Sequence, residues 1–272
     1  MGVFQNNLLA GAAAAASAGG AGFYEYQVEQ SVRFEYASTS RLYRTAGTPT
    51  NADKYTLSMW IKFCDPDSSN SQRMIYQGQS TGEIYEGLYH RPTDNGTIRF
   101  QLQNGGTSFE TWSDDKLYRD TGGFNHLMFV YDSGNGTAAD RNQLYHNGVR
   151  VTLDQSRYSG SMSQNRDGVM NTSGATQNIG NGGTYGNSID AYFAEVLFFD
   201  GQTYSASDVT ETKNGVLIPK DPSSLSFGNN GFHLKFENAS DLGNDSSGNN
   251  NDFTASGLGT DHQVLDSPTF GS

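Results

Sequence analysis

The chain has 272 residues and a formal net charge of −12 at pH 7. Hydrophobic residues make up 35% of it and charged residues 17%, and the remainder is rich in Gly, Ser, Thr and Asn, which is typical of many short strands joined by turns. The negative charge argues against nucleic-acid binding, because that binding depends on Lys and Arg neutralising phosphates. No apolar run approaches the roughly 20 residues of a membrane-spanning helix.

Residues 1–27 form a leader rich in Ala and Gly, MGVFQNNLLAGAAAAASAGGAGFYEYQ. Four interpretations compete: a secretory signal, a helix, a flexible leader, or an arm that another subunit orders. A signal peptide is disfavoured because no Lys or Arg precedes Arg33. An isolated helix of this length is marginal in water. We predict a docking arm, whose anchoring residues are Val3, Phe4, Leu8 and Leu9.

Alternating strands are expected after the leader. VEQSVRFEYA predicts a first strand, and YTLSMWIKF predicts the clearest one, with every second residue apolar. The residues expected to face the core from this second strand are Tyr55, Leu57, Met59, Ile61 and Phe63. Trp60 shares the opposite, polar side, so we expect it either to lie under a loop or to be offered to a ligand.

Cys64 ends the alternating run YTLSMWIKFC and is the single cysteine of the chain. It cannot form an internal disulfide, which favours assembly in a reducing cytoplasm. No His lies close in the sequence to activate its thiol, so we predict a small, partly buried strand residue.

Further strands are predicted at short intervals: RMIYQG, IYEGLY, TIRFQL, FNHLMFVYD, NQLYHNGVRVTL, QNIG, DAYFAEVLFFD and GFHLKFE. FNHLMFVYD and DAYFAEVLFFD are apolar on both sides, so we expect central strands covered on both faces. His126 lies in the first of these and is predicted to be a core histidine bonded to a neighbour. Asn147 and Gly148 tolerate positive φ and predict a tight hairpin turn.

One helix is expected, over SASDVTETKNG. Ser205 and Asp208 have the spacing of a capping box, and Asn214 and Gly215 would form its left-handed end. Many strands with almost no helix predict an all-β protein, a two-sheet antiparallel sandwich with one short peripheral helix. From residue 238 the sequence becomes polar and rich in Asn, Ser and Gly, which indicates either a long loop wrapped on the domain or a linker.

Four segments resemble, in the same order, the strands of laminin-G-like, concanavalin A-like jelly rolls. They are SMWIKF, FNHLMFVYD, LYHNGVRV and AYFAEVLFFDG, within a match from about Val28 to Asp200. Phe124 stands where that family carries Trp. The resemblance implies a jelly roll over residues 28–237, preceded by the arm at 1–27 and followed by a C-terminal tail or linker at 238–272.

The two ends resemble, more narrowly, virion-associated proteins of marine tailed bacteriophages. The matching segments are residues 4–16, 30–34, 231–240, 245–254 and 266–269. This resemblance implies a virion structural protein assembled in the host cytoplasm, with the jelly roll displayed as a tail fibre, spike or capsid decoration. Its implied partners are other virion subunits or copies of itself in a homo-oligomer, and host surface glycans.

No catalytic set is recognised. Jelly-roll glucanases carry E-x-D-x-x-E on one strand, and their carboxylates share a face. In the corresponding EVLFFD, Glu195 and Asp200 have opposite parities, so a regular strand cannot bring them to one glycosidic bond. We predict that the protein is not an enzyme and that Glu195 makes a structural contact.

Calcium is the one cofactor that the resemblance suggests, because laminin-G-like and pentraxin-like domains can bind it at the sandwich rim. Two loops have suitable oxygen ligands. The candidate residues are Asp132 and Asp140 in DSGNGTAADRN, and Asp245, Asn249 and Asp252 in NDSSGNNND. Ordinary turns have the same composition and remain the alternative.

Sugar recognition requires aromatic side chains near strand ends. The candidates in loop-like or strand-edge contexts are Trp112, Tyr85, Tyr89, Tyr118, Tyr158 and Tyr185.

Three functions are compatible with these features. They are a non-enzymatic phage virion protein that adheres to host glycans, a free carbohydrate-binding module or glycosidase fragment, and a subunit of a self-assembling extracellular filament.

Overall fold

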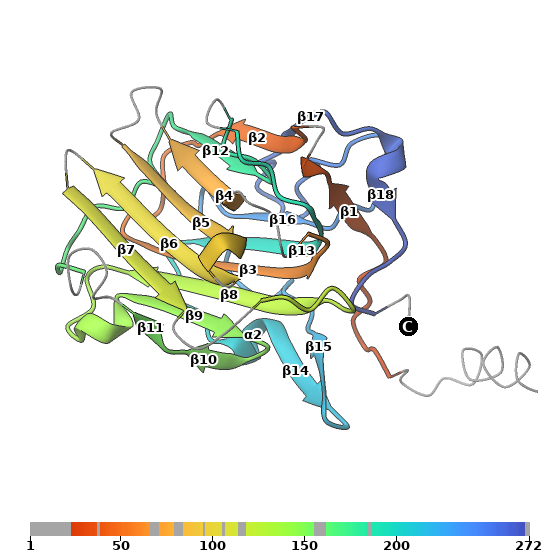
Figure 1. Ribbon diagram of the computed structural model, residues 1–272, viewed down its shortest axis with the longest axis horizontal. Helices are drawn as coiled ribbons and strands as arrows, with labels where there is room; N and C mark the ends of the chain where they lie inside the picture. Colours follow the sequence, from red (N-terminus) through yellow and green to blue (C-terminus); the bar gives the residue numbers. More distant parts are fainter. Residues whose placement is uncertain are drawn as a thin grey trace, which may run out of the picture.

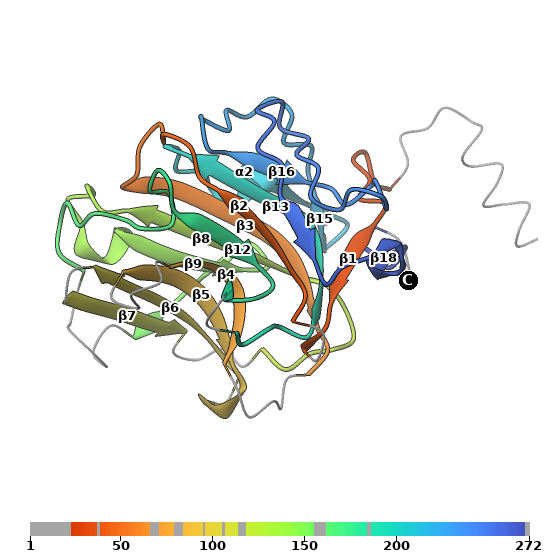
Figure 2. The same cartoon turned by 90° about the horizontal axis from the view of Figure 1, so that it is seen from above.

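The computed structural model describes residues 23–36, 39–65, 71–78, 84–94, 96–104, 107–113, 118–154, 162–183 and 186–269. Over these residues the chain forms two large antiparallel sheets that lie face to face (Figures 1 and 2), which confirms the predicted all-β sandwich. The predicted anchors of the docking arm, Val3, Phe4, Leu8 and Leu9, lie outside the described residues. No helix in the described ranges is long and apolar enough to cross a membrane.

The first sheet has the two long, apolar segments at its centre, as predicted. In spatial order its strands are β10 (Val149–Val151), β9 (Asn142–His146), β8 (Asn125–Asp132), β3 (Lys54–Phe63), β13 (Ala191–Asp200), β1 (Ser31–Phe34) and β18 (Gln263–Val264), with β16 (Phe232–Leu234) also paired to β13. β8 and β13 flank β3 and are buried on both faces. Asn147 and Gly148 have φ of 48° and 78° and form the predicted turn between β9 and β10.

The second sheet covers one face of the first. Its strands are, in spatial order, β11 (Leu153–Asp154), β7 (Thr107–Ser113), β6 (Thr97–Asn104), β5 (Tyr85–Arg91), β4 (Gln72–Gly78), β12 (Thr176–Ile179), β2 (Arg41–Thr45) and β17 (Thr254–Ser256). Short 3-10 turns occur at Pro92–Asp94, Ala138–Asp140 and Thr260–His262. Neighbouring strands β4, β5, β6 and β7 are joined in chain order, so their register is set locally.

One short peripheral helix is present, as predicted, but its predicted extent over residues 205–215 is wrong. Its capping box is present, because Asp208 accepts from the Ser205 backbone N–H at 2.7 Å, but the helix α2 is only Ala206–Val209. The chain then forms a hairpin of β14 (Thr210–Lys213) and β15 (Val216–Pro219), which projects from the first sheet in Figure 1. Asn214 and Gly215, with φ of 52° and 81°, form the hairpin turn instead of a helix end.

The core lies between the sheets. All five residues predicted to face it from β3 belong to one central cluster, together with Leu42, Ile75, Leu88, Phe100 and Phe109 of the second sheet. Tyr55 stacks on Tyr131 and Phe198, with ring centroids 5.2 and 5.1 Å apart. Its hydroxyl donates to the buried carboxylate of Glu86, which also accepts from the backbone N–H groups of Val169 and Met170. The buried carboxylate of Glu86 thus accepts three hydrogen bonds, as buried charge requires.

The outer side of the first sheet is covered as well. Trp60 is 5% exposed and packs with Val28 and Ala194, while Tyr26 and Phe124 lie partly buried beside them. Of the two expectations for Trp60, burial is therefore correct. His126 is fully buried with its Nε2 2.9 Å from the Ser58 hydroxyl, which confirms its prediction as a core histidine. Cys64 follows β3, is partly buried, and has its pKa raised by burial.

Because two histidines are buried, we expect the folded state to lose stability in acid. Burial lowers the pKa of His90 to about 4 and that of His126 to about 3. An unfolded histidine has a pKa near 6.5, so below that pH the unfolded chain binds more protons than the folded one. The contribution of each neutral histidine to the free energy of unfolding is fully present above pH 6.5. It decreases as the pH falls, by about 3 kcal/mol for each histidine at pH 4.

Glu86 acts in the opposite direction, because burial raises its pKa, and it offsets part of this loss. Urea midpoints measured at pH 7 and pH 4.5 check the prediction, and His126→Gln should make the pH dependence shallower. Equal midpoints at the two pH values would contradict it.

Residues 238–269 lie on the sandwich and contribute to both sheets. β17 pairs with β2 at an edge of the second sheet, and β18 pairs with β1 at an edge of the first. The Thr269 hydroxyl accepts from the Val28 N–H at 3.0 Å and donates to the Val28 carbonyl at 2.8 Å. Of the two interpretations of the polar C-terminal segment, the wrapped loop describes these residues.

Candidate ligand-binding face of the second sheet

Strands β5 and β6 each present alternate residues to the core and to the outside. Leu88 of β5 belongs to the central cluster, so Tyr85, Tyr89 and Arg91 lie on the opposite, outer side of the sheet. On β6 the same alternation places Ile98, Phe100 and Leu102 inside and Arg99 and Gln101 outside. The outer side therefore carries aromatic and cationic residues in place of the usual small polar ones.

The register brings Tyr89 and Arg99 into one row with a residue from each of the two flanking strands. Arg73 of β4 pairs with Tyr89, Tyr89 pairs with Arg99, and Arg99 pairs with Trp112 of β7. The Arg73 guanidinium lies 5.5 Å from the centre of the Tyr89 ring, and that of Arg99 lies 5.5 Å from Tyr89 and 5.1 Å from Trp112. Cation and ring thus alternate across four strands, within the distance at which a cation attracts an aromatic face.

Two further arginine–ring contacts extend the row along the strands. Arg73 also lies 4.7 Å from the ring centre of Tyr76, and Arg91 lies 5.5 Å from that of Trp112. Tyr76 stacks on Tyr85 with centroids 6.1 Å apart and planes 27° apart. We refer to these side chains together as the arginine–aromatic face: Arg73, Tyr76, Tyr85, Tyr89, Arg91, Arg99 and Trp112.

Gly87 provides space for the tyrosine rings. It lies on β5 between Tyr85 and Tyr89 and opposite Tyr76. A Cβ atom at this position would stand 3.0 Å from Tyr76 Cδ2 and 3.0 Å from Tyr89 Cε2, closer than ordinary van der Waals contact. Glycine here therefore allows the close approach of two rings, which would have to shift by a few tenths of an ångström to admit a side chain.

A pocket of about 240 Å³ opens on this face. Its lining residues come from β4, β5 and β6 and from two adjoining loops: Ser71, Arg73, Tyr76, Tyr85, Tyr89, Arg91, Arg99, Gln101 and Asn187. Gln101 Nε2 donates to the Tyr85 hydroxyl at 2.7 Å, which fixes both groups at the pocket wall. Rings and planar hydrogen-bonding groups on one wall are the usual means by which a protein holds a small polar ligand.

The arginines are held in place by partners around the pocket. Arg99 forms an ion pair with Glu110, whose pKa is raised by burial and lowered again by Arg99. Arg91 Nε and Nη2 each lie 3.0 Å from the Asp94 carboxylate, and Arg73 Nη1 donates to the Gly186 carbonyl at 2.9 Å. These contacts fix the guanidinium planes before any ligand arrives, which reduces the entropy lost on binding.

Three of the six aromatic candidates belong to this face, namely Trp112, Tyr85 and Tyr89. Tyr118 does not, and its prediction as a sugar platform is wrong. It belongs to the central cluster, 4% exposed, with its ring 5.0 Å from that of His146 and 6.5 Å from that of Phe63. Tyr158 and Tyr185 lie outside the described residues.

The calcium candidates in the 245–252 loop bond to protein donors instead. Both oxygens of Asp245 are occupied, Oδ1 by the N–H groups of His233 and Ser247 and Oδ2 by the Ser247 hydroxyl and the Asn251 N–H. Asp252 accepts from the Asp245 N–H at 2.8 Å, and Asn249 donates to the carbonyls of Gly228 and Gly231. Because donors surround these oxygens, the loop is a set of turns, and its prediction as a calcium site is corrected.

Asp132 and Asp140 are engaged separately. Asp132 lies 3.6 Å from Lys54 Nζ and lines a polar pocket of about 310 Å³ at the sheet end, whereas Asp140 bonds to Arg150 at 2.6 Å. Within the described residues, no three His, Cys, Asp or Glu side chains are grouped so that they could hold a metal ion. The two aspartates do not form the shared site that the sequence suggested.

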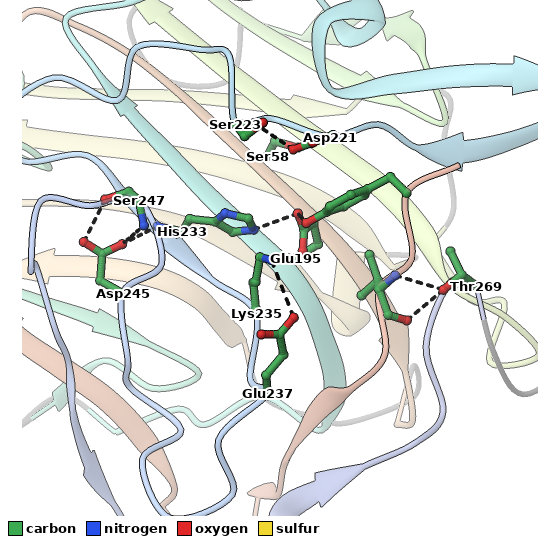
Figure 3. A network of polar contacts seen from close by, with 12 residues as sticks. Ser58, Glu195, Asp221, Ser223, His233, Lys235, Glu237, Asp245, Ser247 and Thr269 are labelled. Carbon is green, nitrogen blue, oxygen red and sulfur yellow. Dashed lines mark hydrogen bonds and ion pairs between the residues drawn. The ribbon is translucent and has the colours of Figure 1, made fainter. Parts of the chain in front are cut away.

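Glu195 lies on β13 of the other sheet, with its carboxylate directed toward His233 (Figure 3). The strand β13 has a bulge between Ala194 and Leu197, and Glu195 there has a φ of 50°. Its Oε1 accepts from the Tyr26 hydroxyl at 2.6 Å and lies 2.7 Å from His233 Nε2. Glu195 is 3% exposed, so it connects the N-terminal segment to β16, as the structural interpretation expected.

Asp200 belongs to a separate network at the end of β13. Its carboxylate accepts from the backbone N–H groups of Thr50, Asn51 and Asn230 and from the Asn171 side chain, over 2.5 to 3.1 Å. It is fully buried. The bulge makes β13 irregular, and even so Glu195 and Asp200 serve different parts of the fold.

The fold is that of a lectin-like jelly roll, two antiparallel sheets with a pocketed outer face on one of them. Residues 36–210, more than half of the chain, match the laminin G type of the concanavalin A-like lectin/glucanases superfamily. The chain therefore belongs to this superfamily. Comparison with curated proteins gave no match.

Several solved structures are similar to this chain at low identity and with TM-scores below 0.5. They include a heptameric pentraxin of Limulus polyphemus resembling serum amyloid P (15% identity, 66% of this chain and 80% of that one, TM-score 0.43). A full-length tailspike protein 2 of an Escherichia coli O157:H7 bacteriophage shows 14% identity over 65% of this chain and 23% of its own, with a TM-score of 0.46. The sialidase module CBM40 of Ruminococcus gnavus shows 13% identity over 67% and 96%, with a TM-score of 0.41.

Proposed function

We propose that the chain is a glycan-binding adhesion protein whose ligand site is the arginine–aromatic face. The observation that carries this proposal is the row Arg73, Tyr89, Arg99 and Trp112, in which rings and guanidinium groups alternate across four neighbouring strands. A sugar ring has apolar C–H faces and a rim of hydroxyls. Aromatic rings contact the former, and fixed planar donors bond to the latter.

The rigidity of the face supports this role, although most of each ring is covered. Tyr89 is 4% exposed and Trp112 is 7% exposed, so each ring is rigid and offers little more than part of one surface. Rigid aromatic rings lose little conformational entropy when a ligand binds. A cross-strand packing role alone would not need three arginines at the wall of an open pocket.

The test is a glycan array probed with the purified domain and with a Trp112→Ala variant. Binding to a defined set of glycans that Trp112→Ala removes supports the proposal, provided that the variant unfolds at a similar temperature. Binding that is unchanged both in Trp112→Ala and in Tyr89→Ala, which alters the pocket lining itself, places the glycan site elsewhere and rejects this face.

The same proposal places the domain on a phage particle, as a tail fibre, spike or capsid decoration without enzymatic activity, held through the arm at 1–27. The virion resemblance of the two ends supports it. The separate engagement of Glu195 and Asp200 supports a binding role over glycoside hydrolysis, which needs two carboxylates across one bond.

Mass spectrometry of purified particles tests the location, and deletion of residues 1–22 tests the attachment. The deleted chain should fold, bind glycan and fail to enter particles. Absence of the chain from particles would reject the virion role and leave the alternative of a free carbohydrate-binding module. Loss of polymerisation by the deleted chain alone in solution would indicate a filament subunit instead.

A further inference from the structure

We infer that the glycan bound at the arginine–aromatic face carries carboxylate or sulfate groups, so that the protein recognises an acidic polysaccharide. This inference rests on the proposed function, because it names the class of ligand for the same pocket. It adds a charge requirement that glycan binding in general does not have.

The composition of the pocket wall is the first support. Among the described residues that line the pocket there are three arginines and no carboxylate. Asp94 and Glu110 lie outside the lining and neutralise Arg91 and Arg99, so the wall keeps a smaller positive charge, in a chain with 17 basic and 29 acidic residues. Positive charge gathered on one face of an acidic protein attracts an anion to that face and leaves the remaining surface repulsive to it.

The bonding of the guanidinium groups is the second support. A guanidinium has five N–H donors in a rigid fork, which matches the two oxygens of a carboxylate or sulfate. Arg99 bonds to Glu110 through Nη2, and its Nε is buried without a hydrogen-bond partner among the described residues. Arg91 directs three N–H groups to Asp94 and Ser71. Donors of both arginines thus exceed the acceptors that the face itself supplies.

The orientation of these groups is the third support. Arg99 lies against the rings of Tyr89 and Trp112, and Arg91 lies against Trp112. Stacking holds a guanidinium plane in place while its edge donors stay available to an anion. A neutral sugar would use the rings and leave the remaining guanidinium donors without an anionic acceptor, whereas an acidic sugar would use both.

The experiment compares polymers with the same sugar backbone and different charge. Polygalacturonate is set against its fully methyl-esterified form, and a sulfated carrageenan against its desulfated form, by calorimetry at 50 and 500 mM NaCl. We expect at least one acidic polymer to bind at least 10-fold more tightly than its neutral partner, and this preference should shrink at the higher salt concentration. The arm that shows the preference identifies the group as carboxylate or sulfate.

Variants separate charge from packing. Arg99→Gln should reduce binding of the preferred acidic polymer at least 10-fold, and Arg99→Lys should restore only part of it, because a lysine keeps the charge and loses the fork. Arg150→Gln is the matched control, since Arg150 is more exposed, ion-paired to Asp140 and outside the pocket lining. It should bind as the parent does.

The outcomes distinguish this inference from the proposed function. Equal binding of acidic and neutral forms, lost in both cases with Tyr89→Ala, would overturn the charge requirement and leave glycan binding at this face intact. Binding of any polymer that survives Tyr89→Ala, or no binding to any of the four polymers or to the glycan array, would overturn both.

Discussion

Replacing Tyr89 by alanine is expected to weaken glycan binding at least 30-fold. Tyr89 is the centre of the row, with Arg73 and Arg99 each 5.5 Å from its ring centre. Its removal takes away a stacking surface and releases two guanidinium groups from their positions. Central residues of this kind contribute about 2 kcal/mol or more to binding, which corresponds to about 30-fold in Kd.

Two control variants make this result specific. Tyr89→Phe keeps the ring and should keep most of the affinity. Tyr43→Ala removes a half-buried tyrosine of β2 that also contacts an arginine, since Arg41 lies 4.8 Å from its ring centre. Tyr43 is not part of the pocket lining. It should bind as the parent does. Equal losses in Tyr43→Ala and Tyr89→Ala would indicate a general disturbance of the sheet and contradict the assignment of this pocket.

Asp200→Ala is expected to lower the free energy of unfolding by more than about 3 kcal/mol. The carboxylate joins the end of β13 to loops that are distant in the sequence, through the N–H groups of Thr50 and Asn230 and the side chain of Asn171. Alanine would leave these buried donors without an acceptor. Urea denaturation followed by circular dichroism measures the change.

Asp221→Ala provides the comparison for Asp200→Ala. Asp221 is exposed and accepts one bond, from the Ser223 N–H at 2.9 Å, so its removal should cost about 1 kcal/mol or less. A similar, small cost for Asp200→Ala would show that solvent replaces the lost bonds and that the Asp200 network is not a main tie between the loops and the sheet.

The sequence predicts the long strands well and the short ones poorly. The burial of β8 and β13 follows from their apolar residues on both sides, and that of β3 follows from its alternation. A strand in the middle of a sandwich must be apolar where it is covered. RLYRT gives no such signal. Arg44 of this segment is 7% exposed, donates to Gln177 and to the Asn230 carbonyl, and lies 5.3 Å from the ring centre of Phe232. In a sequence, an arginine indicates a surface position, so the burial of Arg44 and the strand that contains it were not predicted.

The hairpin of β14 and β15 was missed for a related reason. The capping box at Ser205 and Asp208 is real, but it starts a helix of one turn, and Thr210 and Thr212 favour a strand directly after it. Asn214 and Gly215 serve equally well as a helix end or a hairpin turn. Only the pairing with VLIP decides between them.

The candidate site is partly visible in the sequence. Tyr85, Tyr89 and Arg91 share one parity of IYEGLYHR, opposite to Leu88, so their outward direction follows from alternation. The position of Arg73 and Trp112 beside them cannot be predicted in this way. Neighbours across strands depend on the register, and the register here includes a bulge between Arg73 and Ile75. The arginines were therefore missed, although each lies in or next to a predicted strand.

The most direct test of the central claim uses the two tryptophans. Trp112 belongs to the arginine–aromatic face, and Trp60 is buried on the other sheet with Val28 and Ala194. Glycan titrated into Trp60→Phe should change the fluorescence of Trp112 in a saturable way, and the same titration into Trp112→Phe should leave the Trp60 signal constant. A saturable change confined to Trp60 would contradict the account and place the ligand on the first sheet.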